Sequence, residues 1–190
     1  MWMFDIETLS TDQDAVVLSA ALTWFNPEEK PSFEKLIEDT CFVKFDVMEQ
    51  ARAGRKISKS TLAWWEKMHP AVKEFSYVPK GSDRSVEEGF YIFKEYIKSK
   101  PSNDQTTVWA RGNMDEFVID HLAKTNKIYP LFEYHQWRDV RTAVDILTGS
   151  NNGYCRVNYE GFNSHNVVKH NPIHDCCYDV MMLLYGDAPF

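Results

Sequence analysis

Runs of apolar residues divide the first quarter of the chain into three predicted strands. Residues 2–8 start apolar and then alternate, and successive side chains of a strand point to opposite faces. Residues 15–25 form a longer run, rich in β-branched and aromatic residues, that ends at Asn26-Pro27 and is typical of a central strand. Residues 41–45 alternate again. Three strands in succession predict an antiparallel meander at the start of an α/β domain.

The remainder of the chain predicts helices separated by short strands. Helical periodicity or capping residues place helices over Leu62–Met68, from the capping box Ser85–Glu88, from Asn113 through Ala123, over Val140–Leu147 and over Pro172–Tyr185. Strands are predicted over residues 106–110 and 134–137. Residues 149–166 are rich in Gly, Asn and Ser, and such a long irregular stretch predicts a functional or mobile loop.

Length and composition fit one domain that spans residues 1–190, with 44% apolar residues for its core. No apolar run reaches membrane-spanning length and no leader precedes the first strand, so we expect a soluble, cytoplasmic protein without a membrane partner. The four cysteines lack zinc-type spacing, which predicts reduced thiols. A formal charge of −7 disfavours a protein that coats nucleic acid, but leaves open an enzyme that acts on it.

Four acidic residues lie where elements predicted as core begin or end. Asp5 and Glu7 share one face of the first strand, Asp115 follows the strand at 106–110, and Asp175 lies near the start of the last helix. Like charges held close together need a cation between them, which predicts a divalent metal bound by oxygen ligands. For Asp5 and Glu7 alone, an edge strand with solvated acids remains an alternative.

Three motifs in this order resemble those of the DnaQ-like exonucleases that cleave from the 3′ end, in the branch with a histidine (DEDDh). The motifs are Asp5-Ile6-Glu7-Thr8, Gly112 to Asp115, and His170 to Asp175. Four further segments resemble the phage exonuclease A group within that family. They are Thr61 to Trp65, Trp109 to Gly112, Arg138 to Thr142, and Ile173 to Cys176.

The resemblance implies an RNase H-like fold, with a five-stranded mixed sheet in which parallel strands follow the meander, flanked by helices. It implies a phosphodiester hydrolase in which Asp5, Glu7, Asp115 and Asp175 hold two Mg²⁺ or Mn²⁺ ions and His170 is the general base. Thr8 would touch the terminal nucleotide, Trp64 could stack a base, and Arg111, Arg138 or Arg141 could position phosphate, although arginines at such places are commonly ion-pair partners.

The expected partner is the 3′ end of single-stranded DNA, with host cytoplasm as the location if the chain is phage-encoded. RNA remains open as the substrate, because the same metal site cleaves both and the contact with a 2′-hydroxyl cannot be located from sequence. A non-catalytic adaptor with the same fold is the alternative from another functional class. The retained acids disfavour it.

A second histidine also lies five residues before an acid: His174 precedes Asp179 as His170 precedes Asp175. His170 is the better candidate for the base, because a loop before Pro172 can approach the metal site. His174 would lie inside the first helical turn and face elsewhere.

Overall fold

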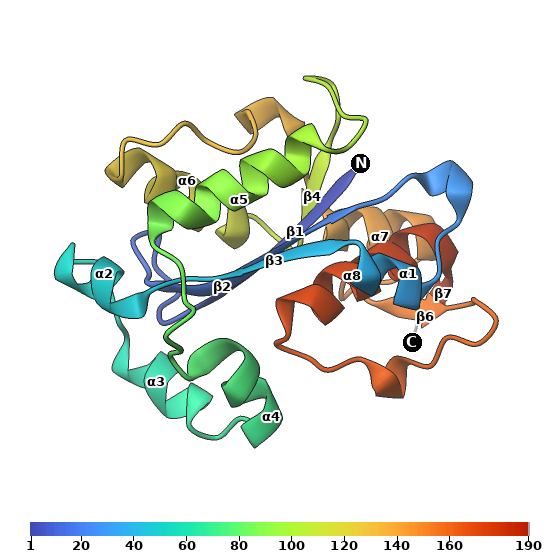
Figure 1. Cartoon of the computed structure of the whole chain (residues 1–190). Coiled ribbons are helices and arrows are strands. Elements are labelled where there is room, and N and C mark those ends of the chain that lie inside the picture. The colour runs from blue at the N-terminus through green and yellow to red at the C-terminus, as the bar shows by residue number, and fades with distance from the viewer. Residues whose placement is uncertain (190) are drawn as a thin grey trace.

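The computed structural model describes residues 1–189, and its centre is a five-stranded mixed sheet in the order β3-β2-β1-β4-β5 (Figure 1). The strands are β1 (Trp2–Thr8), β2 (Val17–Trp24), β3 (Thr40–Lys44), β4 (Val108–Ala110) and β5 (Trp137–Asp139). The first three strands pair antiparallel, whereas β4 pairs parallel with both β1 and β5. The sheet thus confirms the predicted RNase H-like arrangement, with β1 at its centre.

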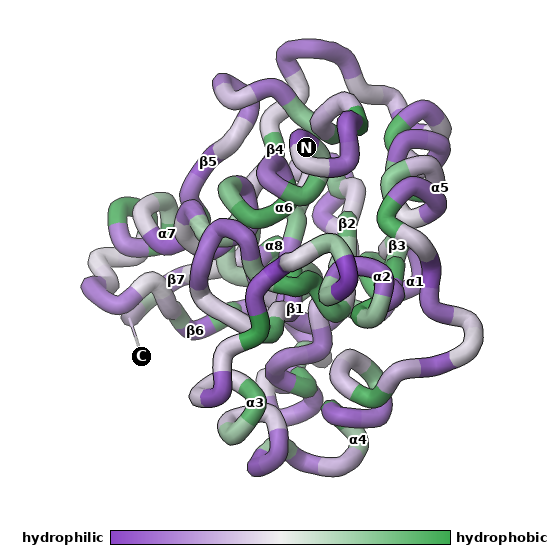
Figure 2. Tube along the Cα trace, turned by 90° about the vertical axis from the view of Figure 1, so that its left-hand side faces the viewer, coloured by the Kyte–Doolittle hydropathy of each residue, from purple (hydrophilic) through white to green (hydrophobic). Residues whose placement is uncertain are grey.

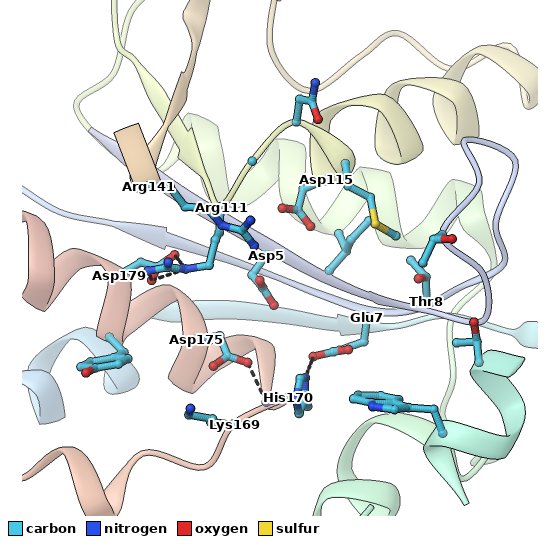
Figure 3. Close-up of a pocket in the computed structure, with 18 of the residues that line it drawn as sticks. Asp5, Glu7, Thr8, Arg111, Asp115, Arg141, Lys169, His170, Asp175 and Asp179 are labelled. Carbon is cyan, nitrogen blue, oxygen red and sulfur yellow. Dashed lines mark hydrogen bonds and ion pairs between the residues drawn. The ribbon is translucent and has the colours of Figure 1, made fainter. Parts of the chain in front are cut away.

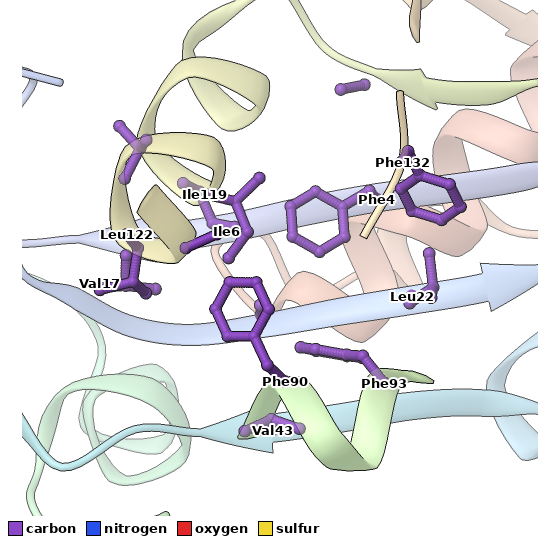
Figure 4. Packing of buried hydrophobic residues seen from close by; sticks show 14 of the residues in the cluster. Phe4, Ile6, Val17, Leu22, Val43, Phe90, Phe93, Ile119, Leu122 and Phe132 are labelled. Carbon is purple, nitrogen blue, oxygen red and sulfur yellow. The ribbon is translucent and has the colours of Figure 1, made fainter. Parts of the chain in front are cut away.

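The alternation of β1 divides the core between the two faces of the sheet. Phe4 and Ile6 face the helices α5 (Val86–Lys98) and α6 (Met114–Thr125), in the cluster shown in Figure 4. Met3 faces the opposite side and packs in a second cluster with α8 (Pro172–Tyr185). Asp5 and Glu7 share the face of Met3. The strand register therefore directs both acids toward α8.

The predicted helices form close to their expected positions. These are α3 (Lys59–Trp65), α5, α6, α7 (Val140–Thr148) and α8. The capping box at Ser85 is present, because the Ser85 hydroxyl accepts from the Glu88 amide and the Glu88 carboxylate accepts from the Ser85 amide. Figure 2 shows apolar and polar residues alternating around α5, as expected for a helix with one buried face.

Several short elements escaped prediction because they carry too few residues for a periodic pattern. They are α1 (Phe33–Glu38), α2 (Val47–Arg52), α4 (Pro70–Val72), a π-helical turn over Lys73–Tyr77 and 3₁₀ turns at Pro27–Glu29 and Ser164–Asn166. The strand predicted over residues 134–137 is wrong by three residues: Tyr134–Gln136 forms a 3₁₀ turn and β5 begins at Trp137.

The stretch expected to be irregular, residues 149–166, contains a strand of a second sheet. β6 (Cys155–Val157) pairs antiparallel with β7 (Gly186–Pro189), which follows α8. Gly186 is required there, because a Cβ would lie 2.5 Å from the Met182 carbonyl oxygen and 2.6 Å from Cys155 Sγ. The four cysteines are free thiols, as predicted.

Within residues 1–189, no helix combines the length and the apolar character that crossing a bilayer would require.

The contact between α5 and the sheet leads to a stability prediction. A Cβ at Gly89 would lie 2.3 Å from Phe45 Cε1, so Gly89→Ala should destabilise the fold although alanine favours a helix by about 1 kcal/mol. Overpacking costs about 1–3 kcal/mol, so we expect a net loss in the free energy of unfolding measured with urea. Gly81→Ala, which meets open space, is the control. A Gly89→Ala protein more stable than wild type would refute this packing.

Candidate active site

The first two acids of the site project from the central strand. Asp5 pairs in register with Ala21 of β2, and a register shift after Glu7 ends the regular pairing. Asp5 Oδ2 is buried and has no hydrogen-bond partner among residues 1–189. A buried carboxylate oxygen without a donor is unfavourable, so it calls for a partner that the chain itself does not supply.

The start of a helix supplies each of the other two acids. Asp115 lies in the first turn of α6 and is 7% exposed, and Asp175 lies in the first turn of α8. Gly112 turns the chain from β4 into α6 with a φ of 83°, and its amide donates to Asp139 Oδ2 at 2.7 Å. This left-handed conformation favours glycine. The turn directs Asp115 toward β1, and all four acids face one another in Figure 3.

Burial and mutual repulsion raise the pKa values of the acids. Burial raises the pKa of Asp115 to about 8 and that of Asp175 to about 7, with the charge of Glu7 adding to both. The pKa of Asp5 lies well above its usual range because of burial and then the charges of Asp115 and Asp175. Burial also raises the pKa of Glu7, against the opposing effect of His170. Without a cation, the cluster therefore retains protons at neutral pH.

His170 lies directly beside this cluster. Its Nδ1 is 3.6 Å from Glu7 Oε1, and its backbone amide donates to Asp175 Oδ2 at 2.8 Å. The pair with Glu7 raises the pKa of His170. Its φ of 63° is uncommon for a residue with a side chain, and the bond to Asp175 holds it there. Glu7, His170 and Asp175 each place one possible ligand atom within 4.8 Å of the other two.

The competing pair of His174 and Asp179 has other contacts. His174 Nδ1 accepts from the Val168 amide at 3.1 Å, and its ring packs edge-on against Phe33. Asp179 accepts from Arg111 Nε at 3.0 Å and 3.1 Å. His174 therefore supports the segment before α8 and lies outside the cavity that borders the acids, whereas His170 and Asp175 both line that cavity.

Arg111, predicted as a phosphate ligand, is held in a buried ion pair. Besides Asp179, its guanidinium donates to the Gly153 carbonyl at 2.7 Å and lies 4.2 Å from the centre of the Tyr154 ring. Its side chain is 13% exposed and that of Asp179 is 8% exposed. Arg111 still lies in the wall of the site, but its contacts are those of a structural residue. Arg138 donates to the carbonyls of His135 and Trp137 and lies outside that wall.

The acids border a cavity of about 680 Å³, which the other substrate-binding candidates also line. Trp64 is 37% exposed and its ring meets the His170 ring edge-on, with 4.7 Å between the ring centres, while Trp65 is fully buried. The Thr8 hydroxyl donates to the Ser10 carbonyl at 2.7 Å. Sequence reasoning assigned no role to several other lining residues, because no local pattern links them. They are Thr11, Ser60, Thr61, Met114, Tyr154, Lys169 and Tyr178.

Four basic residues that precede or begin α3 do not line this cavity: Arg52, Arg55, Lys56 and Lys59. Arg55 is 8% exposed and donates to the Ala15 carbonyl, and Lys56 pairs with Asp12 at 2.9 Å. The charges of Arg55 and Lys56 therefore have partners within the fold.

The donor set fits hard divalent cations. Four carboxylates and one imidazole converge, and one carboxylate oxygen is buried without a donor. Burial, and then mutual repulsion, raises the pKa values of the carboxyl groups, and bound positive charge would oppose both effects. Carboxylate oxygens favour Mg²⁺ and Mn²⁺. Asp5, Glu7, Asp115 and Asp175 are therefore suited to hold such ions.

The fold is α/β, with a mixed RNase H-like sheet and an acidic cluster on its central strand. This combination is typical of nucleases. The comparison with protein families agrees. A family model described as "3'-5' exoribonuclease Rv2179c-like domain" matches residues 1–185, and the chain belongs to that family. The family and the fold together identify a DnaQ-like exonuclease, as the three sequence motifs indicated.

A curated relative comes from Enterobacteria phage T4 and is named "Exodeoxyribonuclease". It is 27% identical to this chain in an alignment that covers 97% of the chain and 88% of the T4 protein. The family description thus refers to RNA, whereas the name of this relative refers to DNA.

The repulsion within the cluster predicts that Asp5→Asn will stabilise the metal-free protein. The folded-state pKa of Asp5 lies above the unfolded value of about 3.9, so the wild type loses stability as pH rises above about 4. Removing this group should raise the melting temperature in chelator at pH 7 by about 2–4 °C per kcal/mol gained, with a smaller gain at pH 4.5.

The same melting curves, repeated with Mn²⁺, provide the control. Mn²⁺ should raise the melting temperature of the wild type and have much less effect on Asp5→Asn, because binding to the folded state alone stabilises it. An Asp5→Asn protein that melts below wild type in chelator at pH 7 would contradict the predicted repulsion.

Proposed function

We propose that this protein is a 3′–5′ exonuclease that hydrolyses the terminal phosphodiester bond of single-stranded DNA, with two bound divalent metal ions and His170 as general base. The observation that carries the proposal is the convergence of four largely buried carboxylates and His170 beside one cavity. Membership of an exonuclease family and the T4 relative support the reaction class. The retained cluster disfavours a non-catalytic adaptor.

Asp5, Glu7, Asp115 and Asp175 would hold the two metal ions, Mg²⁺ or Mn²⁺. Such ions, when bound, stabilise the negative charge of a phosphodiester under attack and make water a stronger nucleophile. Burial strengthens the hold of the carboxylates on a cation, since little water competes for their oxygens.

His170 would accept a proton from the attacking water. Its Nδ1 is directed at Glu7, which leaves Nε2 as the nitrogen that takes the proton. Glu7 stabilises the charged imidazolium that results, consistent with the raised pKa of His170. The side chain is 42% exposed, so the proton can pass on to solvent.

Trp64 and Thr8 would bind the terminal nucleoside. The Trp64 ring is held on edge by Trp65 and His170 and is still partly exposed, so a base can pack against it. The Thr8 hydroxyl proton is engaged with Ser10, which leaves its oxygen as an acceptor for a sugar hydroxyl.

An exoribonuclease of the same mechanism is the second candidate, and the description of the matching family favours it. The two candidates differ only in how the site treats a 2′-hydroxyl.

Single-stranded DNA and RNA of one sequence, labelled at the 5′ end, test the activity on one gel. With Mg²⁺ or Mn²⁺ we expect ladders that shorten from the 3′ end, with DNA degraded faster, and no products in excess chelator. Faster degradation of RNA would select the second candidate. Cleavage of a circular strand, or undiminished cleavage in chelator, would refute an exonuclease that depends on metal ions.

His170→Ala should lower the turnover number by about 10²–10⁴-fold, the usual contribution of a general base, with little change in metal affinity. His174→Ala is the matched control and should cost far less, because His174 lies outside the cavity and is engaged with the Val168 amide and the Phe33 ring. Both variants are measured at saturating Mg²⁺. The opposite ranking would place the base one helical turn later in the chain.

A further inference from the structure

The cavity beside the acids differs in chemistry from one end to the other. One end is lined by uncharged side chains from β1, the turn after it and α3: Thr8, Thr11, Ser60, Thr61 and Trp64. The other end is lined by cationic and phenolic side chains: Arg111, Arg141, Tyr154, Lys169 and Tyr178. The four acids lie between the two ends, as Figure 3 shows for Thr8 on one side and Arg111, Arg141 and Lys169 on the other.

Two of the three cations at the second end are available to a ligand. Arg111 is neutralised by Asp179. Arg141 and Lys169 make no ion pair with any residue from 1 to 189, although both lie close to an acidic cluster. In a protein with a formal charge of −7, two unpaired cations beside the same cavity form a local site for negative charge.

The loop that carries Gly153 and Tyr154 holds both cations in place. A Cβ at Gly153 would lie 2.6 Å from Arg141 Cγ, so the stem of Arg141 packs on that glycine. The φ of Gly153 is 74°, and its carbonyl accepts from Arg111. Lys169 directly precedes His170 in the chain, and its Nζ lies 5.9 Å from the centre of the Tyr154 ring.

We propose that Arg141 and Lys169 bind the phosphate that lies one nucleotide 5′ of the scissile phosphate. This inference rests on the proposed exonuclease function. Beyond the scissile phosphate, the 3′-terminal nucleoside carries no further phosphate, whereas the strand on the 5′ side carries one for each nucleotide. The uncharged end of the cavity suits the nucleoside, and the cationic end suits the phosphates.

The assignment fixes the direction of the strand across the site. The terminal nucleoside lies against Trp64, the scissile phosphate lies at the acids, and the strand leaves over Tyr154 between Arg141 and Lys169. A substrate with no phosphate on the 5′ side of the scissile one forgoes both contacts. Charge-assisted contacts to phosphate are strong enough for their loss to be measured.

Two short substrates separate this subsite from the catalytic centre. A dinucleoside monophosphate contains only the scissile phosphate, and a trinucleoside diphosphate adds one phosphate on its 5′ side. Lys169→Met and Arg141→Met should each lower kcat/KM on the longer substrate by about 10-fold, chiefly through KM. On the shorter substrate, both should stay within about twofold of wild type. Lys124→Met, an exposed change of equal charge outside the cavity, is the control.

The salt dependence provides a second reading. On the longer substrate, each variant should reduce the slope of log(kcat/KM) against log salt by about 0.7, the value for one phosphate contact in a single strand.

Equal losses of kcat/KM on both substrates would show that the variants act through His170 or the fold, and would overturn the subsite. So would variants that match Lys124→Met on the longer substrate. Wild-type protein inactive on both substrates and on longer strands would instead overturn the proposed function, and the subsite with it.

Discussion

The repulsion among carboxylates that are taken out of water governs the organisation of this protein. Asp5 and Glu7 are carried by the central strand of the sheet, whose register fixes both on the face that packs against α8. Two helices begin beside that strand and add Asp115 and Asp175. Apolar packing on both faces of β1 supplies the stability that offsets this local cost. An acidic site of this kind is tolerated because the surrounding core is extensive.

Much of the fold follows from local patterns. The alternation of β1 predicts that Asp5 and Glu7 share a face, and the capping box at Ser85 forms as expected. The 3₁₀ turn before Trp137 displaces β5, because a three-residue strand has no period of its own to fix its limits. The β6–β7 pair escaped prediction since its two strands lie on either side of α8 and neither is long enough to be recognised alone.

The acids and the cavity differ in how far sequence could predict them. The order and spacing of the motifs predicted that the acids and His170 belong to one site. The backbone conformation of His170, with its φ of 63°, could not be predicted in this way, because it depends on the hydrogen bond from its amide to Asp175. The cavity walls combine residues from distant segments, such as Trp64 and Tyr154. Arg111 shows where sequence-based prediction stops. Its position in the sequence suggests a phosphate ligand, and the fold shows that its guanidinium is paired with Asp179.

The ion pair between Arg111 and Asp179 changes the net charge of the acidic cluster. Five carboxylates surround the site, and the guanidinium cancels one of them, so four negative charges remain. Two divalent cations carry four positive charges and would leave the ionised centre electrically neutral. Had position 111 held a neutral residue, the same centre would retain a negative charge after loading and would repel the polyanion that it is proposed to cleave. In the proposed two-metal centre, Arg111 would thus balance the charge through its ion pair with Asp179.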